Sequence, residues 1–151
     1  MAKLYTARIY DSPRIHKAMP DAVQICIQRR PWRYIRKDAG VINFPALGPP
    51  VDLHEETREF LRRAEAEGVS EFEVLDFQMR YAARYIMYVI LDDEVVDEPS
   101  EIRRYLIDQK RDVILECSCD AGQFCHRLLL YHFLIALSGK EFAGGELVLK
   151  E

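Results

Sequence analysis

The sequence predicts an α/β sandwich, in which helices flank a mostly parallel central sheet, built as a single domain over residues 1–151. Three observations predict this fold class. Short β-forming segments alternate with longer segments of helical periodicity, most clearly in the second half of the chain. Residues 112–117 are mainly apolar and β-branched, which is typical of a strand buried on both faces of a parallel sheet. The length and the 49% share of hydrophobic residues suit one core.

Three strands are expected in the first third of the chain. Residues 3–10 are rich in β-forming side chains, and the Asp-Ser-Pro run at 11–13 interrupts them. Residues 22–28 place valine and isoleucine at every second position, which is the spacing of one strand face. Residues 40–44 are the third candidate strand, and the proline- and glycine-containing residues 46–50 form the loop that follows it.

Two long helices are expected in the middle of the chain. Asp52 has the character of a helix N-cap because Glu55 follows it at the capping-box distance, and Gly68 ends this first helix. Ser70 caps the second helix, in which apolar residues recur at helical spacing as far as Ile90. These helices supply the helical part of the α/β alternation.

The last third of the chain again alternates between helix and strand. The acidic residues 92–101 are predicted to form an exposed turn and the start of a third helix. The buried strand 112–117 follows, and residues 126–138 are helical in composition and apolar almost all round. Residues 146–150 are the candidate for the last strand.

Composition excludes some classes of protein. A formal net charge of −4 argues against a protein that coats nucleic acid over its whole surface. The chain contains no apolar run of the length that spans a bilayer, and its first residues lack the features of a secretory signal. A cytoplasmic location without membrane association is therefore expected. No glycine-rich phosphate loop and no Ser-His-Asp order is present.

The feature that points to chemistry is a cluster of cysteines. Cys117, Cys119 and Cys125 lie within nine positions, between the predicted strand 112–117 and the helix that follows. In open α/β sheets, ligands bind beyond the carboxyl ends of the strands, where this loop is expected. The helix dipole, His126 and Arg127 would each favour the thiolate of Cys125.

Four interpretations of this loop remain open. In the first, Cys125 is a nucleophile, His126 carries a proton, Arg127 clamps an anion and Cys117 is a resolving or supporting thiol. The second is a redox pair of Cys125 with Cys117 or Cys119. The third is a metal site, with zinc as the metal, made of the three cysteines and His126, whereas the other interpretations need no cofactor. The fourth gives the cysteines a purely structural role.

A basic segment suggests the nature of the partner. Residues 29–37 contain five cations, no acid and the chain's single tryptophan, a combination that suits phosphates and stacked bases. Together with Arg127, the candidate anion-binding arginines are Arg8, Arg14 and Arg33. The sequence thus predicts a thiol-dependent enzyme that acts on an anionic small molecule, a nucleotide or a nucleic acid. The alternative is a non-catalytic module that binds nucleic acid or protein; whether the protein is an enzyme, and its oligomeric state, stay open.

The cysteine loop also resembles a known family. The strand VILEC, a short loop, and Phe-Cys-His-Arg at residues 124–127 are similar to the C-terminal signature of the "domain of unknown function 488" family. Residues 4–8 (LYTAR) are similar to the first strand of that family. The chain departs from the family pattern at Cys119, where an acidic residue is common. The resemblance implies a compact α/β domain, with Cys117, Cys125, His126 and Arg127 at characteristic positions, but it implies no reaction.

Overall fold

A computed structural model describes residues 1–30, 40–119 and 123–150 of the chain. In these residues a sheet of five strands has the order β3-β2-β4-β1-β5, and every pairing is parallel. The α/β fold with a parallel sheet, predicted from the sequence, is therefore confirmed. The strands are β1 (Leu4–Arg8), β2 (Val23–Cys26), β3 (Ile42–Asn43), β4 (Val113–Cys117) and β5 (Ala143–Glu146).

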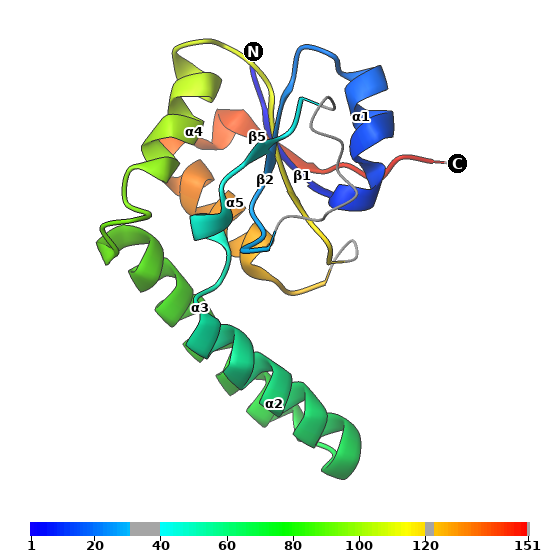
Figure 1. Ribbon diagram of the computed structural model, residues 1–151, viewed down its shortest axis with the longest axis vertical. Coiled ribbons are helices and arrows are strands. Elements are labelled where there is room, and N and C mark those ends of the chain that lie inside the picture. The colour runs from blue at the N-terminus through cyan, green and yellow to red at the C-terminus, as the bar shows by residue number, and fades with distance from the viewer. Residues whose placement is uncertain (31–39, 120–122, 151) are drawn as a thin grey trace.

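Helices cover both faces of the sheet, as Figure 1 shows. On one side lie α4, α5 and the C-terminal part of α3, and on the other side lies α1. The helices are α1 (Ser12–Ala18), α2 (Val51–Glu67), α3 (Glu71–Leu91), α4 (Glu98–Ile107) and α5 (His126–Ser138). Among the described residues, no helix has both the length and the apolar character that crossing a bilayer requires.

Strand β4 occupies the centre of the sheet and is buried along its whole length, as its composition predicts. Its side chains alternate between two hydrophobic clusters. Val113, Leu115 and Cys117 belong to the larger cluster, which includes residues of α3, α4 and α5. Ile114 belongs to the smaller cluster with Ile15 of α1. This alternation places the next even-numbered residue, Glu116, on the α1 side.

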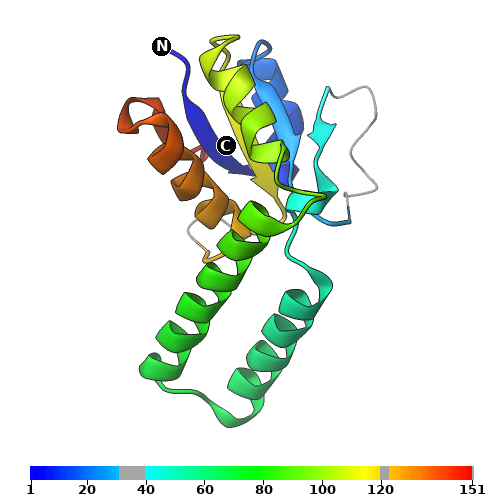
Figure 2. The same ribbon diagram turned by 90° about the vertical axis from the view of Figure 1, so that its left-hand side faces the viewer.

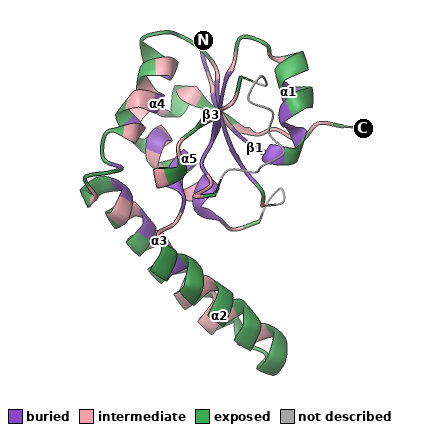
Figure 3. Cartoon of the chain, in the orientation of Figure 1, coloured by how far each residue is buried: buried purple, intermediate pink, exposed green. Residues whose placement is uncertain are grey.

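Helices α2 and α3 form an antiparallel hairpin that extends away from the sheet (Figure 2). The rings of Phe60 and Phe77 stack between them with centroids 4.2 Å apart. Ser70 and Glu73 form a capping box at the start of α3, where the sequence predicts the cap. Most of the hairpin beyond the sheet is exposed (Figure 3). We refer to residues 51–84 as the helical arm.

Two element boundaries near prolines differ from the sequence-based predictions. The sequence predicts a break at Pro13 and no helix there, whereas helix α1 begins at Ser12. Pro13 stands in its first turn, where a residue needs no amide hydrogen. Helix α2 begins at Val51 with Pro50 as its N-cap, so the predicted N-cap role of Asp52 is wrong. Pro50 has the extended backbone of an N-cap and leaves the cap without a side-chain acceptor.

The last strand also differs from the prediction. It covers Ala143–Glu146 rather than residues 146–150, and its sequence AGGE has almost no β-propensity. Gly144 is required there, because a Cβ atom would lie 2.4 Å from the Tyr5 ring of the neighbouring strand β1. Close packing against β1 therefore outweighs intrinsic propensity.

Candidate functional site

The three clustered cysteines converge at the carboxyl end of the sheet. Cys117 ends β4, Cys125 is the N-cap of α5, and Cys119 follows a bend in the chain. Their sulfur atoms all lie within 4.8 Å of one another, and those of Cys117 and Cys125 are 3.6 Å apart. The sequence-based prediction of a thiol cluster in this loop is therefore matched by the geometry.

Burial and hydrogen bonding shift the pKa values of the three thiols in different directions. The side chains of Cys117 and Cys125 are buried, whereas Cys119 is partly exposed. Hydrogen bonds from Cys117 and Cys119 lower the pKa of Cys125, and the positive charge of Arg127 acts in the same direction. Hydrogen bonding to the other two cysteines and burial raise the pKa of Cys117. The cluster thus favours one thiolate, at Cys125, supported by two S–H donors.

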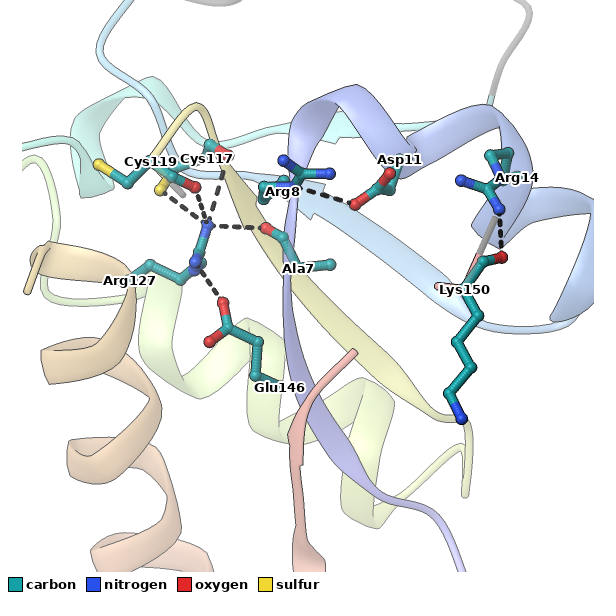
Figure 4. A network of polar contacts seen from close by, with 9 residues as sticks. All are labelled: Ala7, Arg8, Asp11, Arg14, Cys117, Cys119, Arg127, Glu146 and Lys150. Atoms are coloured by element: carbon teal, nitrogen blue, oxygen red, sulfur yellow. Dashed lines mark hydrogen bonds and ion pairs between the residues drawn. The ribbon is translucent and has the colours of Figure 1, made fainter. Parts of the chain in front are cut away.

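Arg127 lies fully buried beside the cluster (Figure 4). Its Nη1 atom donates to the carbonyl oxygens of Ala7 at 2.9 Å and Cys119 at 3.1 Å, and it lies 3.3 Å from the sulfur of Cys117. Its Nη2 atom is 2.5 Å from Oε1 of Glu146. The guanidinium therefore connects the carboxyl ends of β1, β4 and β5. The sequence predicts that Arg127 binds an external anion, whereas in the structure its guanidinium binds carbonyl oxygens and a carboxylate of the chain itself.

The ring of His126 makes its polar and aromatic contacts outside the cysteine cluster. Its Nε2 atom is 2.8 Å from the carbonyl oxygen of Ile27, just beyond β2, and its ring packs edge-on against Tyr85. Burial lowers its pKa, which favours the neutral ring. The sequence-based set of four metal ligands is thus reduced, among the described residues, to three cysteines.

Among the described residues, the other predicted anion ligands are Arg8, which pairs with Cys117 in the β1–β4 register, and Arg14 of α1. Arg8 forms an ion pair with Asp11 at 3.2 Å, and Arg14 donates to the carbonyl oxygen of Lys150 at 2.7 Å (Figure 4). Arg33 and most of the basic segment 29–37 lie outside the described residues. Arg29, at the start of that segment, donates to the carbonyl oxygen of Pro49.

Two acidic residues near the site were not identified from the sequence. Glu146 was expected within a strand, and no pattern marks it as the partner of Arg127. Glu116 is fully buried on the α1 side of β4, where Nε2 of Gln24 donates to it at 2.8 Å. Burial raises the pKa of Glu116 to about 7. Glu116 and Gln24 each stand within an otherwise apolar strand segment of the sequence, and this is the signal that indicates a buried polar pair.

Comparisons with known proteins identify no relative of this chain. It matches no family model, no curated protein and no solved structure. The resemblance to the "domain of unknown function 488" family therefore stays a prediction from the residues of the cysteine loop.

Proposed function

We propose that the protein binds one thiophilic metal ion, with zinc as the first candidate, through Cys117, Cys119 and Cys125. The observation that carries this proposal is the convergence of the three sulfur atoms within 4.8 Å of one another. In a tetrahedral zinc site, Zn–S bonds of about 2.3 Å place bound sulfurs ~3.8 Å apart. The 3.6 Å between the sulfurs of Cys117 and Cys125 is close to that separation.

The backbone accommodates the short spacing of these ligands. A Cys-x-Cys pair in a continuous strand would point its side chains in one direction but hold them about two residues apart. Here the strand ends at Cys117 and the chain bends at Ser118 and Cys119, which brings the second sulfur toward the first. Cys125 then approaches from the start of α5. Three separate backbone positions thus supply three ligands.

The surrounding charges favour the deprotonated form that a metal needs. The start of α5 presents the positive end of its helix dipole to Cys125, and the guanidinium of Arg127 lies 3.3 Å from the sulfur of Cys117. These positive charges partly offset the negative charge of a group of thiolates around a divalent ion. Zinc sites with three protein ligands keep a fourth position for water or substrate, so we infer a site that accepts an exogenous ligand.

A thiol-dependent enzyme acting on a nucleotide or nucleic acid is the second candidate. It is favoured by the lowered pKa of Cys125, which hydrogen bonds from two neighbouring thiols cause. It needs a substrate to reach a sulfur, and Cys119 is the most accessible of the three. The two candidates differ in what happens to the thiols when metal is added.

Metal titration of the reduced, metal-free protein tests the proposal. We expect about one equivalent of zinc or cobalt(II) to bind, with a thiolate charge-transfer absorption for cobalt and loss of thiol alkylation in the loaded protein. Cys119→Ala should weaken binding by roughly tenfold or more, because it removes one of three ligands from an otherwise intact site. The same loss is expected for Cys125→Ala.

Cys26→Ala is the matched control, because Cys26 is a buried cysteine of β2 outside the cluster. This variant should bind metal like the original chain. Absence of stoichiometric binding, or equal binding by Cys119→Ala and the original chain, would overturn the proposal. Rapid alkylation of Cys125 that saturating zinc leaves unchanged would instead support the thiol-dependent enzyme.

A further inference from the structure

Helix α3 carries, along the helical arm and as far as Ile86, a stripe of apolar side chains that the described residues leave largely exposed. Phe72, Leu75 and Met79 of α3 are 76%, 56% and 64% exposed. Ala83 is also exposed, and Ile86 is only partly buried where α3 reaches the sheet. At 100° per residue these five positions lie within an arc of about 80° on the helix surface. The buried residues Tyr81, Tyr85 and Val89 occupy a different face.

We propose that this stripe is the contact surface between two copies of the chain, with the two α3 helices packed antiparallel about a two-fold axis at Met79. Large contiguous apolar patches are uncommon on monomeric proteins and mark interaction surfaces. A second copy is the occupant because the stripe from Phe72 to Ile86 has the same spacing in both directions: these members are separated by 3, 4, 4 and 3 residues, and Ile90, 41% exposed, continues the stripe beyond them. A two-fold axis at Met79 therefore sets Phe72 against Ile86 and Leu75 against Ala83 of the other copy.

Charge complementarity supports the same alignment. Asp76 and Arg80 lie beside the stripe on one flank, have side chains 48% and 72% exposed, and form an ion pair at 3.1 Å within one helix. In the antiparallel arrangement the same flanks of both copies meet. Asp76 of each chain then lies about two residues, or ~3 Å along the axis, from Arg80 of the other. Along that flank the order of charges is Asp76, Arg80 of the other copy, Arg80, and Asp76 of the other copy, so each carboxylate borders a guanidinium across the contact.

The shape of the molecule is compatible with this arrangement. The arm extends beyond the sheet and its covering helices, as Figures 1 and 2 show. Packing two arms antiparallel would form a layer of four helices with one sheet domain at each end. The ion pairs of Arg84 with Asp52 and of Arg63 with Glu73 already lie between α2 and α3, so they stay within each arm. Asp76 and Arg80 are thus the charges that the proposed contact uses.

The molar mass in solution is the first test, measured by light scattering over a range of concentrations. We expect twice the 17.7 kDa of the chain, and Met79→Glu should halve that mass because it places two carboxylates together at the two-fold axis. Val148→Glu, at an apolar residue that is 67% exposed outside the arm, is the matched control and should leave the dimer intact. A monomer at all concentrations, or a dimer that survives Met79→Glu, would overturn the proposal.

Charge reversal and crosslinking test the antiparallel register. Asp76→Arg and Arg80→Asp should each raise the dimer dissociation constant roughly tenfold or more, because either change leaves four like charges on that flank. The double variant should restore dimerisation, because each carboxylate then again borders a guanidinium of the other copy. Met79→Cys should form a disulfide between copies on mild oxidation, whereas Phe72→Cys should not, because its own copy lies about 21 Å away. Crosslinking of both variants would indicate parallel helices and overturn the antiparallel arrangement. Crosslinking of neither would place the axis elsewhere.

Discussion

Arg127→Met is expected to lower the free energy of unfolding by about 3–5 kcal/mol, because it removes one partner from a buried network of charges and carbonyl groups. The guanidinium has no exposed surface and connects Ala7, Cys119 and Glu146 across three strands. Methionine fills much of the volume but cannot donate, so the carbonyl oxygens at the strand ends lose their donor. Chemical denaturation followed by circular dichroism measures the loss.

A double-mutant cycle separates the ion pair from the rest of this network. Glu146 keeps 19% of its side chain exposed, so it can recover part of its hydration when Arg127 is replaced. We expect Arg127→Met with Glu146→Gln to cost less than the sum of the two single substitutions. Arg104→Met is the control, because Arg104 is 55% exposed in its ion pair with Glu101, and its loss should cost below about 1 kcal/mol. An Arg127→Met variant as stable as Arg104→Met would show that the network contributes little.

This role of Arg127 differs from the one that its sequence position suggests. An arginine beside a cysteine at the start of a helix indicates a binding site for an external anion. If that were its role, the Arg127→Met variant would be as stable as the original chain. The structure instead supplies three internal acceptors, Ala7, Cys119 and Glu146, two of which come from segments remote in sequence. Spacing within one loop cannot indicate partners that β1 and β5 bring to it. His126 illustrates the same limit, since its partner Ile27 follows β2.

Local patterns did predict the elements whose own residues dictate them. The uninterrupted apolar run of β4 indicates a central strand, and the Ser70 cap marks the start of α3. The cysteine cluster could likewise be predicted, because Cys117 ends a strand and Cys125 precedes the helix that follows it. Strand β5 could not, because Gly144 is required by the ring of Tyr5 and Gly145 by its φ of 85°, rather than by any propensity of their own segment.

Glu116→Gln is expected to remove a pH dependence of stability that the original chain shows between about pH 4.5 and 7. Burial raises the pKa of Glu116 to about 7, from an ordinary value of 4.5. In this window the native state retains a proton that the unfolded chain has lost, so stability falls as the pH rises. At about 1.4 kcal/mol per pH unit, the loss across the window is of order 3 kcal/mol. Glutamine stays uncharged and can still accept from Gln24, so the variant should be the more stable protein at pH 8.

Urea denaturation of both proteins at pH 5 and pH 8, with a chelator and a reductant present, measures this difference. The chelator removes metal, whose binding to the thiols is itself pH-dependent, and comparing two chains with identical cysteines cancels the titration of the thiols. Glu65→Gln, at an exposed position of α2, is the matched control and should follow the original chain at both pH values. Parallel stability profiles for Glu116→Gln and the original chain would mean that the carboxyl of Glu116 ionises in the native state as easily as in the unfolded chain. In that case the hydrogen bonds of Gln24 and of the Ser12 hydroxyl to Glu116, rather than a retained proton, would stabilise its carboxyl group.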